Sequence, residues 1–212
     1  QPDQGIWEAR GKPQHYVSSK LMCWVALDRA AKLARIRGES SLAAKWAETA
    51  TEVRTDILEH GVDDRGVLRQ HYATTALDAS ALLAAIFGFL PGDDRRLRAT
   101  VLTIADELTE HGFVLRYRTD ETDDGMSGKE GTFVICSFWL VSALAIIGEQ
   151  RRARDLMQRL VKVASPLGLY AEEFDVATGR HLGNFPQAFS HLALIEAASR
   201  IVLAERLAEL SG

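Results

Sequence analysis

The sequence contains little cysteine or proline, no excess of basic charge and no long apolar segment. Its 212 residues include only 2 cysteines and 5 prolines, so few residues interrupt helices. The 25 basic and 29 acidic residues give a net charge of -4, whereas a nucleic-acid-binding domain needs a basic face. The longest apolar run, residues 132–147, contains Ser137 and Ser142 and is shorter than the roughly 20 residues of a membrane span. We therefore expect neither nucleic acid nor a membrane as a partner.

Several motifs that mark reactive sites are also absent. Cys23 and Cys136 lie inside apolar runs, so we expect two buried, reduced thiols rather than a disulfide or a metal site. There is no CxxC or HExxH motif, and no metal is expected. The sequence also has neither a GxxxxGK phosphate loop nor a GxSxG nucleophile elbow.

The composition is that of a globular protein. Hydrophobic residues make up 47% and charged residues 25% of the chain, which is enough to bury a sizeable core in one domain or in part of a larger one. The first residue is not Met, and no basic segment followed by an apolar one comes after it. We expect residues 1–212 to be a single partial domain excised from a longer chain, and we expect that chain to be cytoplasmic.

Helical stretches of two kinds alternate along the chain. One kind is apolar on nearly every side, as in helices that are buried all round; it covers residues 18–27, 79–90, 132–147 and 188–198. The other kind has apolar residues three and four positions apart, between charged ones; it covers residues 43–58, 97–108 and 153–161. Inner and outer helices alternate in this way in an α/α toroid. The sequence therefore predicts an all-α fold of helical hairpins in an inner and an outer layer.

The links between these helices differ in length. Each predicted inner helix is followed by a short link, at residues 37–39, 91–93 and 148–150. Each is preceded by a long polar and aromatic segment, at residues 1–17, 61–78, 112–130 and 165–187. In a two-layer toroid all the long segments lie on the same rim, and long irregular segments in compact domains are usually functional. We expect the functional site on that rim.

The long segments carry aromatic, carboxylate and arginine side chains, a mixture suited to a sugar. Glycoside hydrolysis needs two carboxyl groups, one as acid and one as base or nucleophile. Glu8 follows Trp7, which we expect to shield it from water, and Glu172 and Glu173 lie in another long segment. The spacing alone favours ordinary surface glutamates over a catalytic pair, so it does not assign these residues to catalysis.

Five ordered blocks resemble the family 15 glycoside hydrolases, the group of glucoamylases and bacterial trehalases. They are residues 4–8 (QGIWE), 19–29 (SKLMCWVALDR), 130–133 (EGTF), 171–173 (AEE) and 183–191 (GNFPQAFSH). The resemblance implies part of an (α/α)6 barrel. It also implies exo-acting hydrolysis of α-glucosidic bonds with inversion of configuration.

The resemblance assigns roles to individual residues. It implies that Glu8 is the general acid and Glu172 the general base, with Glu173 as the alternative base because fungal relatives have Glu-Gln there. Arg116 and Tyr117 match an Arg-Tyr pair that binds sugar hydroxyls. An inverting pair stands about 6.5–9.5 Å apart, and we expect that separation for Glu8 and Glu172.

Further residues are expected to bind substrate on the same basis. They are Trp7, Glu130, Phe189, which stands where fungal glucoamylases have tryptophan, and Lys20, which could equally point to solvent. His15 and His71 are better explained as structural. Asp120, Asp124, Gly125 and Glu130 partly match a calcium loop, but the spacing differs and a solvated acidic loop is favoured.

The resemblance also implies what is missing. We expect the upstream half of the barrel, and any N-terminal β-sandwich, to lie outside these residues. Inner helices would then be exposed on two flanks, so we expect self-association and an inactive isolated fragment.

The main prediction is an exo-acting glucoamylase-like hydrolase that releases β-D-glucose from maltooligosaccharides, and the first alternative is an α,α-trehalase of the same family. The second alternative is a non-catalytic helical-repeat module that binds sugar or another protein, but the presence of both Glu8 and Glu172 favours an enzyme. The expected partner of either enzyme is an α-linked glucose oligosaccharide or trehalose, and two carboxyl groups with water need no cofactor.

Overall fold

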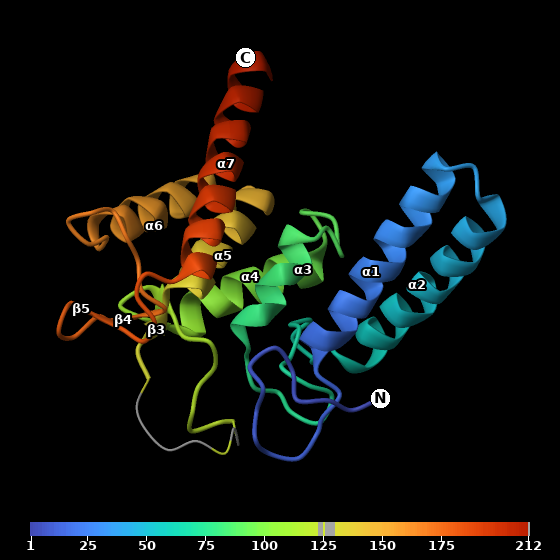
Figure 1. Ribbon diagram of the computed structural model, residues 1–212, viewed down its shortest axis with the longest axis horizontal. Helices are drawn as coiled ribbons and strands as arrows, with labels where there is room; N and C mark the ends of the chain where they lie inside the picture. The colour runs from blue at the N-terminus through green and yellow to red at the C-terminus, as the bar shows by residue number, and fades with distance from the viewer. Residues whose placement is uncertain (123–124, 126–129, 212) are drawn as a thin grey trace.

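The computed structural model describes residues 1–122, 125 and 130–211, and helices dominate it (Figure 1). The helices are α1 (Val17–Ile36), α2 (Ser40–His60), the 3₁₀ helix η1 (Ala79–Leu82), α3 (Leu83–Ile86), α4 (Arg95–Glu107), α5 (Val134–Ile146), α6 (Gln150–Lys162) and α7 (Ala188–Ser211). Short strands lie between them: β1 (Thr109–Glu110), β2 (Phe113–Val114), β3 (Thr132–Phe133), β4 (Glu173–Asp175) and β5 (Arg180–Leu182). The predicted all-α class is confirmed and every expected helix has a counterpart, but the helix expected at residues 79–90 is a 3₁₀ turn followed by a four-residue α-helix that ends at Ile86.

The two predicted layers follow from how each helix is buried. Helix α5 packs against α3, α4, α6 and α7, and Phe138 in its middle has no exposed surface. Helix α6 instead buries one stripe, which includes Leu156 and Leu160, and turns its arginines outward. An all-round apolar helix at the centre and an amphipathic helix outside it are the arrangement that the sequence predicts.

The end helices differ from the prediction that all inner helices are buried. Cys23 on α1 is exposed, so the expected buried thiol is wrong there, whereas Cys136 on α5 is buried, and both cysteines are free. On α7, Leu192 is 60% and Ile195 62% exposed. Helix α1 and helix α7 lie at opposite ends of the row of inner helices (Figure 1), so each has an inner neighbour on one side only.

The beginning of α5 also differs from the prediction. Residues 132 and 133, expected to open the helix, form β3, in which Thr132 pairs with Phe174 and Phe133 with Glu173. The buried Thr132 hydroxyl donates to the Phe174 carbonyl over 2.8 Å. Strand β4 in turn pairs with β5 in an antiparallel hairpin. This small sheet fixes the segment that carries Glu172 and Glu173 beside the start of α5.

The long segments lie together, as predicted. In Figure 1 the N-terminal segment, the segment before α5 and the β4–β5 hairpin all lie at the lower edge, and the short α1–α2 link lies at the opposite edge. No helix in the described part of the chain has both the length and the apolar character needed to cross a membrane.

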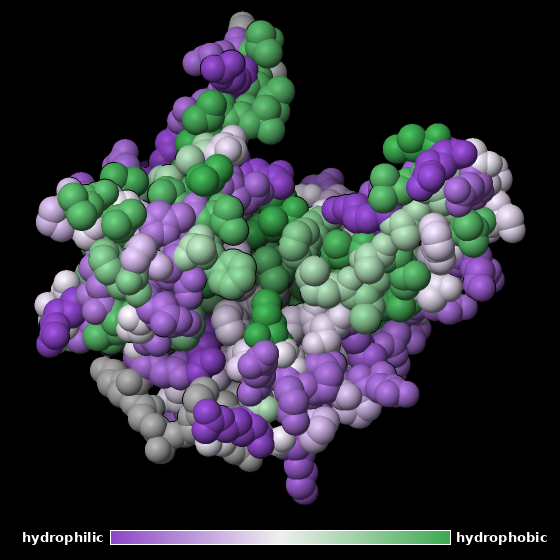
Figure 2. Space-filling view, in the orientation of Figure 1, coloured by the Kyte–Doolittle hydropathy of each residue, from purple (hydrophilic) through white to green (hydrophobic). Residues whose placement is uncertain are grey.

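The exposed flanks lead to a prediction about association. Figure 2 shows hydrophobic residues along α7 and at the tip of the α1–α2 hairpin. We propose that the chain prepared alone self-associates through the exposed faces of α1 and α7, because water is excluded when apolar surfaces meet. Sedimentation velocity should give a mass that rises with concentration. The double variant Leu192→Lys, Ile195→Lys should lower it toward the 23.4 kDa of one chain.

A matched control separates this effect from a general change in charge. Leu167 is 83% exposed but lies in the segment after α6, so Leu167→Lys should leave the association unchanged. A single-chain mass at every concentration for the unaltered protein would contradict the proposal.

Candidate active site

The N-terminal loop positions Trp7 and Glu8. Asp3 anchors it, because its Oδ1 accepts hydrogen bonds from the Gly5 backbone N–H (2.6 Å) and from the Ser19 hydroxyl at the start of α1 (2.7 Å). Gly5 and Glu8 both adopt left-handed backbone angles, with φ of +69° and +53°. The tight turn leaves the Glu8 side chain exposed on the rim, so the expectation that Trp7 shields it from water is wrong for this chain alone.

Gly5 is required both by its left-handed backbone angle and by the closeness of the Tyr16 ring, so an alanine there should destabilise the fold more than an alanine at a glycine with the backbone angle alone. A Cβ at Gly5 would lie 2.9 Å from the Tyr16 ring, whereas one at Gly38, with φ of +75°, would meet nothing. Both alanine variants carry the left-handed strain of about 1–2 kcal/mol, and only Gly5→Ala adds the clash. We expect Gly5→Ala to lower the thermal unfolding midpoint clearly more than Gly38→Ala. Equal decreases would show that the loop adapts without cost.

Trp7 turns its ring inward. Its indole Nε1–H donates to both oxygens of Asp78, at 3.0 and 3.1 Å. The ring packs edge-on against Phe133 at 5.8 Å and lies 6.2 Å from the Trp139 ring. Trp7 therefore links the N-terminal loop to β3 and α5.

Asp78 was not predicted as a site residue. Burial raises the pKa of its carboxyl group, while hydrogen bonds from Ser80, Trp7 and Gln70 oppose that rise. The sequence does contain one signal for it: Asp78 is a single acidic residue between apolar neighbours at the start of an apolar helix (residues 76–85, ALDASALLAA). A buried charge at such a position is costly unless hydrogen bonds satisfy it.

Arg116 and Glu130 form a forked ion pair beside Trp7. The Arg116 Nε lies 2.7 Å from Glu130 Oε2, and Nη2 bonds Oε1. The guanidinium carbon lies over three aromatic rings, at 4.6 Å from Tyr117, 5.1 Å from Phe133 and 5.9 Å from Trp7. The structure thus brings together four of the predicted residues, Trp7, Arg116, Tyr117 and Glu130.

The adjacent glutamates Glu172 and Glu173 have different partners. Glu172 Oε2 accepts from the Asn184 backbone N–H at 3.2 Å, and a Cβ at Gly183 would lie 2.7 Å from that oxygen. Glu173 Oε2 accepts from the Gly131 backbone N–H at 2.8 Å. Glu173 begins β4 and Glu172 lies just before it, and their side chains bond different segments, so Glu173 holds the Gly131 turn while Glu172 lies beside Asn184.

Glu172 lines an aromatic cavity of about 290 Å³. Its walls are Ile6, Trp7, Phe133, Ile135, Trp139, Glu172, Gln187, Phe189 and Ser190. Phe189 is 64% exposed at its edge, and Glu8 is not among the lining residues. Flat rings around one carboxylate form a surface on which the apolar face of a sugar can stack.

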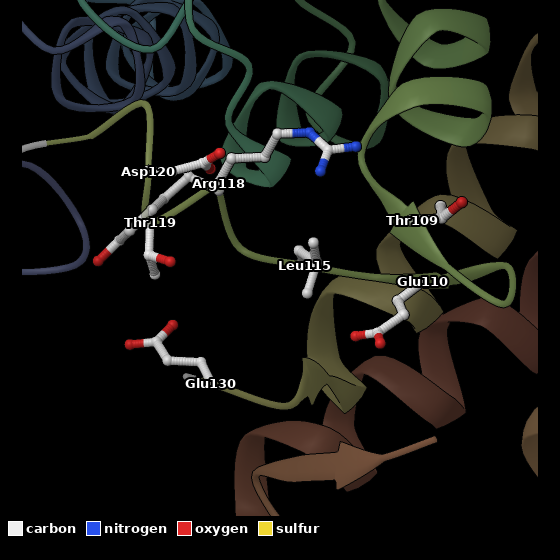
Figure 3. A pocket seen from close by; sticks show the side chains of 8 residues that line it. Thr109, Glu110, Leu115, Arg118, Thr119, Asp120 and Glu130 are labelled. Atoms are coloured by element: carbon white, nitrogen blue, oxygen red, sulfur yellow. The ribbon is translucent and has the colours of Figure 1, made fainter. Parts of the chain in front are cut away.

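A second, more polar cavity of about 350 Å³ is lined in part by Glu130 (Figure 3). Figure 3 shows Glu130, Thr119 and Asp120 on one side of it and Glu110 and Thr109 on the other. The described residues contain no group of three or more His, Cys, Asp or Glu arranged to hold a metal ion. Of the calcium-like positions, Asp124 lies outside the described residues.

Lys20 is bound within the α1–α2 hairpin. Its Nζ lies 3.4 Å from Asp56 Oδ2 and 5.2 Å above the Tyr72 ring, and the Tyr72 hydroxyl donates to the same carboxylate oxygen at 2.6 Å. The His15 ring stacks on Tyr72 at 5.7 Å. The His15 contact fits the structural alternative for that residue, whereas Lys20 is paired with Asp56 rather than pointing to solvent.

Glu173 gives a prediction on pH. Burial raises the pKa of its carboxyl group, Glu130 and Glu172 add to the rise, and Gly131 and Arg116 oppose it. A carboxyl whose pKa is higher folded than unfolded binds more protons in the folded state between those two values. The free energy of unfolding should therefore fall as pH rises through that window, and less so in Glu173→Gln. Denaturant titrations from pH 4 to pH 7 test this, and identical pH dependence in both proteins would contradict it.

Known proteins similar in sequence show which family this chain belongs to. A sequence profile of the glycosyl hydrolases family 15 matches residues 1–199. The chain belongs to this family. It is 64% identical over 212 residues to a trehalase of Mycolicibacterium smegmatis and to a trehalase of Mycobacterium tuberculosis. A trehalase of Thermoplasma volcanium is 38% identical over 94% of the chain. The chain spans 32%, 31% and 32% of these relatives, about a third of their length.

Solved structures support the fold of this family 15 chain. A glycosidase in complex with glucose matches 96% of the chain, with a TM-score of 0.81 at 22% identity. A glucoamylase from Saccharomycopsis fibuligera matches 94% of the chain, with a TM-score of 0.75 at 11% identity. The chain covers 56% and 57% of those two structures. The predicted resemblance and the two-layer helical architecture are both confirmed.

Proposed function

We propose that this family 15 chain supplies the acid and the base of an inverting α,α-trehalase. One observation carries the proposal: Glu172 and Trp7, which directly precedes Glu8, line one aromatic cavity in a chain that is 64% identical to two trehalases over its whole length. That identity favours trehalose, the substrate of the alternative, over the maltooligosaccharides of the main glucoamylase-like prediction.

The proposed reaction uses each carboxyl group once. Glu172 as a carboxylate takes a proton from a water molecule, whose oxygen attacks C1 of one glucose unit. Glu8 as a carboxylic acid donates its proton to the glycosidic oxygen, which leaves with the second glucose. Water enters on the face opposite the leaving group, so the attacked glucose emerges as the β anomer and the leaving glucose as the α anomer. Glu8 and Glu172 would then stand about 6.5–9.5 Å apart, with that water between them.

The surrounding side chains would bind the sugar. The proposed subsite combines the rings of Trp7 and Phe189 with the Arg116–Glu130 pair. An arginine held in a fixed plane by a carboxylate keeps its direction toward a ligand. Glu173 bonds the Gly131 turn, which supports Glu172 rather than Glu173 as the base. The Tyr117 ring packs against the face of the Arg116 guanidinium and would help to hold it in place.

We further propose that this chain is the C-terminal part of the catalytic barrel of a longer enzyme. The curated relatives are about three times as long, and the exposed apolar faces of α1 and α7 would be covered by the remaining inner helices. The chain prepared alone would then be inactive, because the leaving-group side of the cleft would be incomplete.

Substrate preference tests the proposal. The complete enzyme should release glucose from trehalose with a kcat/KM at least about 100-fold above that for maltotetraose, a lower bound because sites that hydrogen-bond their substrate can reject analogues by larger factors. A preference for maltotetraose would restore the glucoamylase-like assignment. Saturable sugar binding without glucose release from either substrate would instead indicate a non-catalytic module. Glucose release by the 212-residue chain alone would contradict the incomplete-barrel proposal.

A further inference from the structure

Asp78 connects three parts of the rim that are distant in sequence. Its side chain bonds Trp7 of the N-terminal loop, 71 positions earlier in the chain. Its backbone pairs with Tyr117 in an isolated antiparallel bridge, and the next residue, Ala79, donates its N–H to the Arg116 carbonyl at 2.8 Å. Asp78 therefore connects Trp7 to the segment that carries Arg116 and Tyr117.

Each carboxylate oxygen of Asp78 accepts two hydrogen bonds. Oδ1 accepts from the Ser80 backbone N–H at 2.7 Å and from Trp7 Nε1 at 3.0 Å. Oδ2 accepts from Gln70 Nε2 at 3.2 Å and from Trp7 Nε1 at 3.1 Å. The residue is only 2% exposed. A buried carboxylate is costly unless such donors surround it, and here the indole N–H bridges both oxygens, which fixes the plane of the ring.

We propose that Asp78 is a positioning residue for the general acid, acting through the Trp7 ring on the backbone that carries Glu8. This inference rests on the proposed function. Trp7 is bonded directly to Glu8 in the chain, and Glu8 occupies a left-handed backbone conformation that only surrounding contacts can maintain. Asp78 holds the ring from one side and Phe133 from another. Loss of the Asp78 bond frees the ring to turn and allows the Glu8 carboxyl to leave its position at the glycosidic oxygen.

The alternative is that Asp78 only caps η1. Asp94 provides the matched control, because it caps α4 in the same way, with its Oδ1 accepting from the Arg96 backbone N–H at 2.9 Å. Asp94 is the residue directly before α4, and its side chain bonds Arg96 rather than a proposed site residue. A purely structural effect would be shared by Asp78→Ala and Asp94→Ala, both of which remove the acceptor oxygens, whereas a positioning effect belongs to Asp78→Ala alone.

The test compares two substrates in the complete enzyme. Trehalose needs a proton on its leaving oxygen, whereas α-glucosyl fluoride loses fluoride with little help from an acid. We expect Asp78→Ala, which removes both acceptor oxygens, to lower kcat on trehalose about 100-fold, the cost of a misplacement of about 1 Å, with KM changed by less than about threefold. Activity on α-glucosyl fluoride should be nearly retained, and the alkaline limb of the trehalose pH profile should shift. Asp94→Ala should change none of these.

A second variant keeps the test decisive if Asp78→Ala does not fold. Trp7→Phe keeps a ring and removes the indole N–H, so it should reproduce the selective loss on trehalose. In the double variant the two losses should not add, because both remove the same bond. Equal losses on both substrates, or full activity on trehalose, would overturn the inference alone. Failure of the unaltered enzyme on both substrates would overturn the proposed function, and the inference with it.

Discussion

Glu172→Gln should lower kcat on trehalose by about 10³-fold, within the range attributed to a positioned general base. The amide has the size of the carboxylate and can still accept from the Asn184 backbone N–H, but it cannot take a proton from water. Because the side chain keeps its shape, KM should change by less than about threefold. Initial rates of glucose release over a range of trehalose concentrations measure both quantities.

Glu173→Gln is the matched control for that prediction. It makes the same chemical change at the next residue, where the side chain bonds the Gly131 N–H and an amide oxygen can replace the carboxylate oxygen. Activity should remain within about tenfold of the unaltered enzyme. If Glu173→Gln lost activity and Glu172→Gln kept it, the two roles would have to be exchanged.

Glu8→Gln should produce a loss of similar size on trehalose, about 10³-fold, but with a different dependence on substrate. The glutamine cannot donate a proton to the leaving oxygen, and a glucose alkoxide is a poor leaving group without one. Fluoride leaves readily, so α-glucosyl fluoride should be hydrolysed at nearly the unaltered rate. Rates on the two substrates, measured side by side, show whether the missing step is protonation.

The base variant is the control for this substrate test. Glu172→Gln should lose activity on both substrates, because attack by water is needed in either case. If Glu8→Gln also lost both activities equally, Glu8 would not act as the acid. The Trp7–Glu8 loop would then have to be regarded as a sugar-binding element.

The layered fold could be predicted because each helix shows its environment in its own sequence. The all-round apolar run at residues 132–147 indicates burial, and the stripe that includes Leu156 and Leu160 indicates an outer position. Burial at the two ends of the row could not be predicted in the same way. Whether Cys23 or Leu192 is covered depends on which neighbours are present, and local periodicity carries no such information.

The candidate site could be predicted only in part, because local sequence identifies single segments but not their distant partners. Short blocks such as Trp7-Glu8 and Ala171-Glu172-Glu173 mark positions within one segment, and the structure gives the two glutamates different hydrogen-bond partners. Asp78 was missed because its meaning depends on Trp7, a partner 71 residues away. A lone acid in an apolar run indicates that a buried partner exists but does not say which one.

The most direct test of the proposed inverting mechanism is proton NMR of the first glucose released from trehalose by the complete enzyme, before the anomers interconvert. Inversion at one of the two glucose units should give equal amounts of α- and β-glucose. The β anomer carries the oxygen of water activated by Glu172, and the α anomer is the glucose protonated at the departing oxygen by Glu8. Release of α-glucose alone would contradict it, because that product ratio requires retention and a carboxylate that attacks the sugar itself.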